Sequence, residues 1–323
     1  MDARRGFACC DLLAPAKLNL LLEVLARRED GFHEIETLMV PINLFDSLTV
    51  RAEPEGSVRL RCRWAPGLQM AKRDAGPSMV ARQATSAAGG RPPIADWEEL
   101  PERGENIVVR AIELLRLRAG TRAGAVVALT KRIPSAAGLG GGSSDAAAAL
   151  VAANRVWNLG WSREQLHEVA AEIGSDVPFF LDSGAALCRG RGERIEALPA
   201  IPAMNFVVVA PPGGLSTADV YRGCRPAAAP RRAEVLAAAL RTGDMRKVAA
   251  AMHNGLGMAA EQLSPWIGRV KHELADCGCT GVQMSGSGTS CFGICRTSRH
   301  ARRAARWMRA RGWSRSAAVR SID

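Results

Sequence analysis

The chain has 323 residues, of which 47% are hydrophobic and 23% are charged, and it carries a formal net charge of +11. These values are ordinary for a globular protein of one large or two modest domains. The most apolar run, residues 146–153, is far too short to cross a bilayer, and no long apolar segment follows the charged N-terminus. We therefore expect no membrane span and a cytoplasmic location.

The positive charge comes almost entirely from arginine. Lysine occurs only at positions 17, 72, 131, 247 and 271, which leaves 38 of the 43 basic residues as arginine. The arginines are spread along the chain and, apart from two tryptophans near the C-terminus, are not interleaved with aromatic residues. This pattern favours compositional drift over a nucleic-acid-binding surface. The arginine-rich C-terminal helix is the alternative, but its arginines surround the helix, so we expect no nucleic-acid partner.

The nine cysteines include no paired C-x-x-C spacing, which is the usual sign of a zinc site. An odd number of cysteines also argues against a disulfide framework. We expect a reduced protein.

The first third of the chain has the character of strands. Leu18–Leu25, Glu34–Ile42 and Ser47–Ala52 are apolar or alternating, and Asp30-Gly31 marks the first turn. Val58–Arg63 alternates apolar and basic residues, as a half-buried strand does.

Residues 64–103 differ from their surroundings. They are rich in Gly, Pro, Ala, Ser and Arg and show no sustained period. We interpret them as a flexible insertion, to which the sequence assigns no role.

Regular structure resumes at Asn106. A strand is predicted at 123–132, and helical periodicity or a capping box predicts helices at 107–115, 143–156 and 163–173. In the C-terminal half, strands are predicted at 206–210, in a strand–loop–strand at 282–294, and at 314–320; helices are predicted at 229–241, 244–260, 264–276 and 300–311. Antiparallel strands with separate helices indicate an α+β fold. We place a domain boundary at residue 200, giving domains at 1–200 and 201–323.

The most informative segment is a loop of small residues at 134–144, between a predicted strand and a predicted helix. Small residues let backbone N–H groups approach an anion closely, and the start of the following helix adds positive potential at the same place. The loop therefore predicts phosphate binding. The hydroxyls of Ser143 and Ser144 can contact phosphate or a magnesium ion.

Two commoner phosphate-binding patterns do not fit this loop. A Walker A loop has Lys followed by Ser or Thr after its last glycine, whereas here Ser143-Ser144 follows. A Rossmann fingerprint counted from Gly138 requires glycine at its sixth position, which is Ser143.

Three motifs together resemble those of the GHMP kinases, the family of galactokinase, homoserine kinase and mevalonate kinase. The loop resembles the second family motif. Ala14-Pro15-Ala16-Lys17-Leu18-Asn19-Leu20 resembles the first, and Met284-Ser285-Gly286-Ser287-Gly288-Thr289-Ser290 resembles the C-terminal glycine motif. The motifs occur in the family order across nearly the whole chain. The resemblance implies a two-domain fold, with an N-terminal ribosomal-protein-S5-like domain that binds ATP and a C-terminal ferredoxin-like domain.

The resemblance also implies a small-molecule kinase that uses ATP and Mg²⁺. Phosphoryl transfer needs a group that accepts the proton of the acceptor hydroxyl and a charge that neutralises the γ-phosphate. Asp176, within Gly174-Ser175-Asp176-Val177-Pro178, is the candidate base, and Lys17 is its candidate partner. A lysine in an apolar strand is costly unless it is paired. The implied nucleotide-binding residues are Asn106, Pro134, Ser135, Ala136, Ala137, Gly138, Leu139, Gly140, Gly141, Gly142, Ser143 and Ser144. The C-terminal glycine motif adds Gly286, Ser287 and Gly288 as candidate site residues.

The implied acceptor is a cytidine-diphosphate-linked sugar alcohol of isoprenoid biosynthesis, because Asp30-Gly31-Phe32-His33-Glu34 resembles the cytidine-binding element of one branch of the family. The residues that would bind it are Asn19, Phe32, His33, Thr217 and Tyr221. Core packing of Tyr221 and a helix cap at Asn106 are the alternative readings of those two residues. No protein ligand for a metal is predicted except, potentially, Ser144.

Other functions stay open on the sequence alone. A related kinase acting on homoserine or mevalonate would share the ATP motifs, and a non-catalytic module could keep the fold. The presence of both Lys17 and Asp176 argues against the second. Either a monomer or a homodimer fits.

Overall fold

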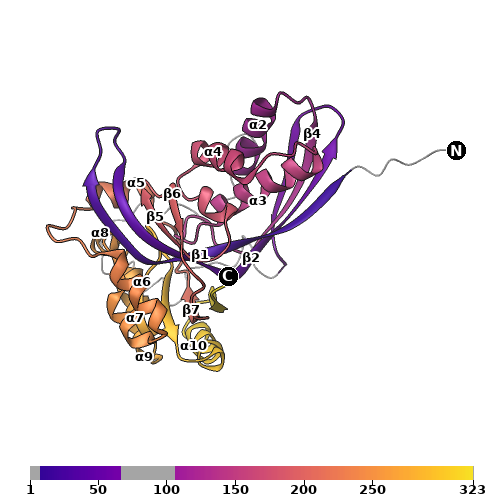
Figure 1. Ribbon diagram of the computed structural model, residues 1–323. Helices are drawn as coiled ribbons and strands as arrows, with labels where there is room; N and C mark the ends of the chain where they lie inside the picture. Colours follow the sequence, from indigo (N-terminus) through magenta and orange to yellow (C-terminus); the bar gives the residue numbers. More distant parts are fainter. Residues whose placement is uncertain (1–7, 67–105, 323) are drawn as a thin grey trace.

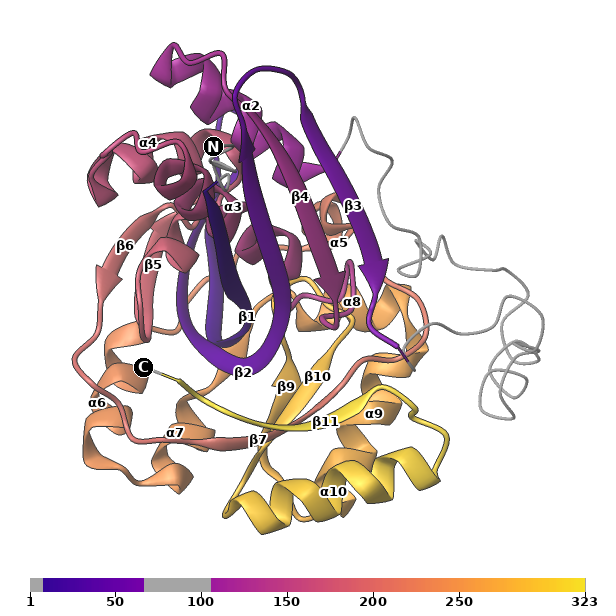
Figure 2. The same ribbon diagram turned by 90° about the vertical axis from the view of Figure 1, so that its right-hand side faces the viewer.

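The computed structural model describes residues 8–66 and 106–322. Two β-sheets form the framework, and the helices pack around them (Figures 1 and 2). Of the insertion predicted at 64–103, residues 67–103 lie outside the described residues. The predicted start at 64 was one residue too early, because Trp64 is the last residue of a strand.

A long hairpin of two strands organises the first sheet. β1 (Cys9–Arg27) and β2 (His33–Glu53) pair antiparallel along almost their full lengths. The three predicted strand segments are confirmed as strand, but their bounds were too short. The segments 34–42 and 47–52 belong to one strand, which continues through residues 43–46, and β1 begins nine residues before the predicted Leu18. Shifts in register, such as that between Pro15 and Ala16, bend the hairpin without ending either strand. At the tip, Gly31 has φ +84°, a conformation that favours glycine.

The other strands of this sheet lie on both sides of the hairpin. Among the described residues the strands run in the order β3-β4-β2-β1-β8, with β5 paired to β2 and β6 paired to β5. Their bounds are β3 (Val58–Trp64), β4 (Gly124–Lys131), β5 (Ala186–Gly190), β6 (Arg194–Ala197) and β8 (His253–Asn254).

Three helices lie together beside β1 and β2 (Figure 1): α2 (Ile107–Ala119), α3 (Gly141–Val156) and α4 (Arg163–Ile173). The capping box of α4 is confirmed, since Ser162 and Gln165 each accept a hydrogen bond from the other's backbone N–H. α3 begins at Gly141, two residues before the predicted start, so part of the glycine-rich loop is already helical. The short 3₁₀ helix η1 (Pro178–Leu181) follows α4.

The second sheet has the strand order β11-β7-β10-β9 within the described residues. Its strands are β7 (Asn205–Val209), β9 (Thr280–Met284), β10 (Cys291–Cys295) and β11 (Ser316–Arg320). The helices of this half are α5 (Thr217–Gly223), α6 (Ala233–Thr242), α7 (Met245–Ala251), α8 (Gly257–Leu263), α9 (Pro265–Asp276) and α10 (Ser298–Ala310).

The single helix predicted at 244–260 was wrong. The chain leaves α7 at Met252 and forms the short strand β8, which pairs parallel with Leu21 and Leu22 of β1, before α8 begins. This strand inserts a piece of the C-terminal half into the first sheet. The expected boundary at residue 200 lies between β6 and β7, which belong to different sheets.

A shared core joins the two sheets. Leu20 and Leu38 of the hairpin belong to the same buried cluster as Phe206 and Phe292 of the second sheet, and the two phenylalanine rings pack edge to face. Fully burying side chains of this size stabilises the fold by about 1.5–3 kcal/mol each. The shared core fixes the turn between β9 and β10 beside β1.

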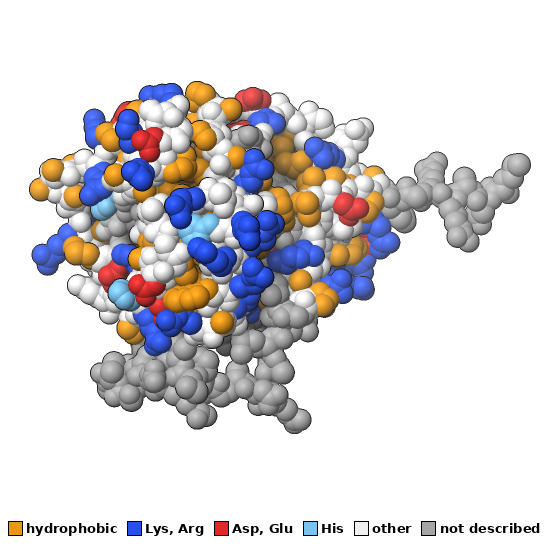
Figure 3. Space-filling model, turned by 90° about the horizontal axis from the view of Figure 1, so that it is seen from below, with side chains coloured by type: hydrophobic (Ala, Val, Ile, Leu, Met, Phe, Trp, Pro, Cys, Tyr) orange, Lys and Arg blue, Asp and Glu red, His pale blue; other side chains and the backbone are white. Residues whose placement is uncertain are grey.

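No helix in the described part of the chain is both long enough and apolar enough to cross a membrane. Lys and Arg side chains are distributed over the face seen in Figure 3, with hydrophobic side chains between them.

Candidate active site

A cavity of about 720 Å³ lies where the three sequence motifs meet. It brings together all but two of the predicted site residues. The lining includes Lys17, Asn19, Phe32, His33, residues 134–143, Asp176, Thr217, Tyr221 and residues 286–288.

Backbone hydrogen bonds connect the loop to both other motifs. The N–H of Lys17 donates to the carbonyl of Leu139 at 3.0 Å, and the N–H of Ser290 donates to the carbonyl of Ala137 at 3.0 Å. The Ser285 hydroxyl donates to the carbonyl of Gly138 at 2.9 Å. β1, the loop and the β9–β10 turn therefore form one hydrogen-bonded unit at the cavity.

Gly138 shows why this unit requires glycine. Its φ is +76°, and a Cβ atom there would lie 2.0 Å from the carbonyl oxygen of Ser285. Any side chain at position 138 would separate the loop from the β9–β10 turn. Ala136 also has positive φ, +49°, which alanine adopts at a cost of about 1–2 kcal/mol. The loop conformation is thus maintained by its tertiary contacts.

The start of α3 lies at the cavity. Gly141, Gly142 and Ser143 line the cavity, and the N-terminal N–H groups of a helix attract anions. Ser144 is buried and does not line the cavity, and its hydroxyl has no hydrogen-bond partner within the described residues.

Lys17 and Asp176 lie close together in the cavity wall. The Nζ of Lys17 is 3.5 Å from Oδ2 of Asp176 and donates to Oδ1 of Asn19 at 2.5 Å. The lysine side chain is only 4% exposed, whereas that of Asp176 is 33% exposed. Lys17 and Asn19 point to the same side of β1, as their spacing predicts. The Asn19 amide in turn donates to Thr37 of β2, which fixes its orientation.

A second buried lysine lies behind the loop. Lys131, at the end of β4, forms ion pairs with Asp46 of β2 and Asp145 of α3. Burial alone would lower the pKa of Lys131, but the two carboxylates raise it above its usual value. Asp46 also accepts hydrogen bonds from the backbone N–H groups of Arg132 and Ile133. The network therefore anchors the chain on both sides of the phosphate-binding loop.

Aromatic residues occupy the other part of the cavity, near the tip of the β1–β2 hairpin. The rings of His33 and Tyr221 are 5.0 Å apart and tilted, and Phe32 is 50% exposed. Burial, with the charge of Arg27, lowers the pKa of His33, so the neutral imidazole is favoured. Burial, followed by the charge of Asp176, raises the pKa of Tyr221. A planar ligand can stack here beside a protonated tyrosine hydroxyl and a neutral imidazole.

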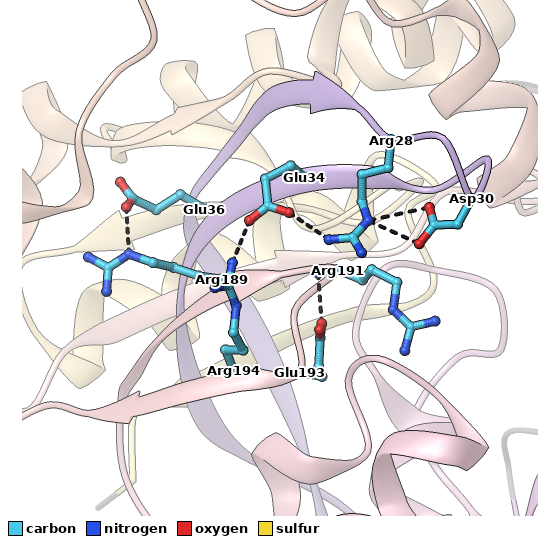
Figure 4. Close-up of polar contacts among 8 residues, drawn as sticks. All are labelled: Arg28, Asp30, Glu34, Glu36, Arg189, Arg191, Glu193 and Arg194. Carbon is cyan, nitrogen blue, oxygen red and sulfur yellow. Dashed lines mark hydrogen bonds and ion pairs between the residues drawn. The ribbon is translucent and has the colours of Figure 1, made fainter.

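Arginine–carboxylate pairs hold this tip against the β5–β6 hairpin (Figure 4). Arg28 pairs with Asp30 at 3.1 Å and with Glu34 at 2.8 Å, and Glu34 also pairs with Arg194 at 2.5 Å. These groups are at least partly exposed, so water screens each pair and it contributes little stability. Their effect is to fix the position of the tip.

The sequence analysis missed Arg191. It lies in the β5–β6 turn, lines the cavity, and its guanidinium carbon is 4.8 Å from the centroid of the Phe32 ring. No local pattern distinguishes it from the 37 other arginines. Ser175 and Thr37 also line the cavity without having been singled out.

The remaining predicted residues have clear places. Asn106 caps α2, and its side chain accepts from the N–H of Val108 at 2.9 Å; its neighbour Ile107, not Asn106, lines the cavity. The Thr217 hydroxyl lies 2.9 Å from that of Ser287, which joins α5 to the C-terminal glycine motif.

Family models match both halves of the chain. The model described as GHMP kinases N terminal domain matches residues 106–184, and the one described as GHMP kinases C terminal matches residues 236–312.

Individual relatives agree with these matches. A 4-diphosphocytidyl-2-C-methyl-D-erythritol kinase from Pelotomaculum thermopropionicum is 43% identical over 87% of this chain and 88% of its own. One from Shouchella clausii is 38% identical over 87% of this chain and 84% of its own. The crystal structure of a 4-(cytidine 5′-diphospho)-2C-methyl-D-erythritol kinase aligns with a TM-score of 0.75 and 34% identity, covering 97% of this chain and 100% of that one.

A homoserine kinase from Cytophaga hutchinsonii aligns with a TM-score of 0.70 over 100% of this chain and 96% of that one, at 20% identity, which is a likeness of fold. The implied α+β kinase fold is thus confirmed. With motifs, cavity and relatives in agreement, this chain belongs to the GHMP kinase family, among its 4-diphosphocytidyl-2-C-methyl-D-erythritol kinases.

Proposed function

We propose that this chain transfers the γ-phosphate of ATP to a hydroxyl of 4-diphosphocytidyl-2-C-methyl-D-erythritol, a step of the non-mevalonate route to isoprenoid precursors. The observation that carries the proposal is the similarity to kinases of that name over 87% of the chain, including 43% identity with one of them. The Lys17–Asp176 pair, which lies between the phosphate loop and an aromatic pocket, agrees with it.

The phosphate donor lies along the glycine-rich loop in this proposal. The N–H groups of 138–143 and the start of α3 contact the phosphates, and Gly286, Ser287 and Gly288 line the opposite wall. Asn106 is assigned to the adenine side, where Ile107 lines the cavity.

Asp176 accepts the proton of the acceptor hydroxyl as the phosphoryl group is transferred. Lys17 pairs with this carboxylate and adds positive charge at the γ-phosphate. Asn19, fixed by Thr37, positions the acceptor hydroxyl.

The cytidine part of the acceptor stacks between Phe32 and Tyr221, and His33 binds an edge of the base. Thr217 contacts the same ligand from α5. Arg191, above the ring of Phe32, adds a charge that suits the diphosphate.

We infer that Mg²⁺ accompanies ATP, because the residues present suit a hard cation. The buried hydroxyl of Ser144 lacks a partner within the described residues, and it is an oxygen ligand of the kind that Mg²⁺ prefers. Asp176 is the only carboxylate lining the cavity in the described part of the chain, so phosphate oxygens and water would complete the coordination. When bound, the ion neutralises charge on the β- and γ-phosphates.

The decisive experiment supplies ATP and Mg²⁺ with each of three acceptors: 4-diphosphocytidyl-2-C-methyl-D-erythritol, homoserine and mevalonate. Product formation, followed by ³¹P NMR, is expected only with the first. Faster turnover of homoserine or mevalonate would contradict the proposal. Chelation of Mg²⁺ should abolish turnover, and Ser144→Ala should raise the Mg²⁺ concentration required.

A cytoplasmic location is also part of the proposal. All nine cysteines fall within the described residues, and each is a free thiol, as a reducing compartment favours. A monomer or homodimer without nucleic-acid partners remains our prediction, which size-exclusion chromatography with light scattering and a salt-dependent RNA and DNA shift assay can test. The division into two domains at residue 200 is likewise a proposal, which the position of this residue between two strands of different sheets supports.

A further inference from the structure

Two cysteines and a histidine meet at the open end of the β9–β10 hairpin. Cys279 directly precedes β9 and Cys295 ends β10, so the antiparallel pairing of these strands brings the two residues together. Their sulfur atoms are 3.7 Å apart. Both sulfurs and one ring nitrogen of His300, in the first turn of α10, lie within 4.8 Å of one another. None of the three residues lines the nucleotide cavity.

The distance between the sulfurs matches that in a tetrahedral zinc site. With Zn–S bonds of about 2.3 Å, two thiolates at the tetrahedral angle are about 3.8 Å apart. A Zn–N bond of about 2.0 Å would place the histidine nitrogen roughly 3.5 Å from each sulfur. The histidine nitrogen and the sulfurs therefore need to approach by at most about 1.3 Å to share one ion.

The cluster is buried, and the surrounding backbone makes room for it. Cys279, Cys295 and His300 are 8%, 2% and 9% exposed. A Cβ atom on Gly293 would lie 2.6 Å from the Cβ of Cys279, so a side chain at position 293 would displace Cys279 from Cys295. The absence of a side chain at 293 is what permits the two thiols to meet.

The ring of His300 is oriented as a metal ligand's usually is. One ring nitrogen, Nε2, lies 2.9 Å from the carbonyl oxygen of Cys277, to which it can donate a proton. A histidine that binds a metal commonly donates its other ring N–H to such a carbonyl. In that tautomer the lone pair belongs to Nδ1, which accepts a hydrogen bond of 3.3 Å from the N–H of Arg296. An ion at Nδ1 would replace this single hydrogen bond.

We propose that Cys279, Cys295 and His300 form a structural zinc site, with a water molecule as the fourth ligand. Two thiolates and an imidazole suit Zn²⁺ and exclude Mg²⁺, which prefers oxygen. Each of the two thiols loses its proton to solvent as its sulfur binds the ion, so the site of Zn²⁺ and two thiolates is electrically neutral. The ligands come from the residue just before β9, the end of β10 and the first turn of α10. The sequence therefore shows no C-x-x-C pair at this site.

The proposed ion would fasten α10 to both strands of the hairpin, whose other end carries the glycine turn at 286–288. It would therefore stabilise the second sheet without entering the reaction. The proposed zinc site does not depend on the proposed kinase activity. In the test below, kinase activity is measured only to show that a variant is folded.

The test uses untagged full-length protein, reduced and freed of metal with a chelator, and titrated with Co²⁺ as a spectroscopic substitute for Zn²⁺. We expect a sulfur-to-cobalt charge-transfer band that saturates at one ion per chain and is displaced by Zn²⁺. Cys279→Ser and Cys295→Ser should abolish the band. His300→Gln, whose amide can still reach the carbonyl of Cys277, should weaken binding by roughly tenfold or more.

A Cys9→Ser/Cys10→Ser variant is the matched control, because these thiols lie near the N-terminal end of β1, in the other sheet. It should keep both the band and the rise in melting temperature that Zn²⁺ produces. The proposal is wrong if wild-type protein shows no band, if the band survives in folded Cys279→Ser or Cys295→Ser protein with kinase activity, or if the control variant loses it.

Discussion

The ammonium group of Lys17 lies 3.5 Å from the carboxylate of Asp176, and the two differ sharply in exposure: 4% of the lysine side chain is accessible against 33% of the aspartate's. The lysine is enclosed by the fold, while the aspartate faces the cavity. A substrate hydroxyl can thus reach the carboxylate while the buried ammonium group stays in place beside it. This arrangement suits a proton acceptor better than a purely structural ion pair.

Asp176→Asn keeps the size of the side chain and removes its ability to accept a proton. We expect kcat to fall by about 10²–10⁴-fold, with the dissociation constant for ATP nearly unchanged when measured by calorimetry. Asp219→Asn, which alters a half-buried carboxylate paired with Arg222, is the control and should keep full activity. Wild-type kcat in the Asp176 variant would remove this residue from the mechanism.

Lys17→Met should lower kcat by about 10²-fold or more, because a buried charge at the γ-phosphate is lost. Since Lys17 and Asp176 act as a pair, the double variant should be little slower than the slower single variant. The measurement is a double-mutant cycle on kcat. Losses that multiply would show that the two side chains act independently.

Lys131→Met leaves the carboxylates of Asp46 and Asp145 buried without their partner. We expect a loss of about 3–5 kcal/mol in the free energy of unfolding, measured with urea. The KM for ATP should rise as well, because Asp46 holds the start of the phosphate loop. Lys247→Met, at an exposed position of α7, is the control. Equal stability of the two variants would mean that the buried network contributes nothing.

Asp145 predicts a dependence of stability on pH. Burial, and the charge of Asp46, raise its pKa from 3.8 to about 7 in spite of Lys131. Between these two values the folded protein binds more protons at this residue than the unfolded chain does, so stability should fall as pH rises from about 4 to 7. In Asp145→Asn this contribution should vanish. Parallel urea curves for wild type and variant across this range would contradict the assignment.

Arg191→Ala should raise the KM for the cytidylylated acceptor by roughly tenfold, through the loss of a charge above Phe32. The KM for ATP should not change. Arg194→Ala, which removes the ion pair between β6 and Glu34 of β2, is the matched control and should have a smaller effect. An equal rise for ATP and acceptor would indicate a general disturbance of the cavity.

Sequence patterns predicted those elements correctly whose structure depends on residues close together in the chain. The Ser162–Gln165 capping box correctly gave the start of α4, and the alternation at 58–63 correctly gave β3. The three sequence motifs, at 14–20, 134–144 and 284–290, also correctly identified residues that line one cavity.

Sequence patterns gave wrong or missing predictions where contacts with residues far away in the chain determine the structure. The stretch 244–260 has helical character, yet the Asn254 side chain donates to the carbonyls of Met284 and Gly286, and the N–H of Gly255 donates to Leu22. These contacts across the fold outweigh local propensity and interrupt the helix. Arg191 was not predicted as a site residue for a similar reason, because it contacts Phe32 only through the folding of the β5–β6 turn.

The contact of Gly138 with Ser285 limits how the two halves of the chain can be combined with other proteins. A Cβ at 138 would lie 2.0 Å from a carbonyl in the other half of the molecule, and β8 of that half completes the first sheet. The two halves are therefore not interchangeable modules. A chimera that joins residues 1–200 to the C-terminal part of another protein would fold correctly only if that part reproduces both the close approach at Gly138 and the pairing of β8 with β1.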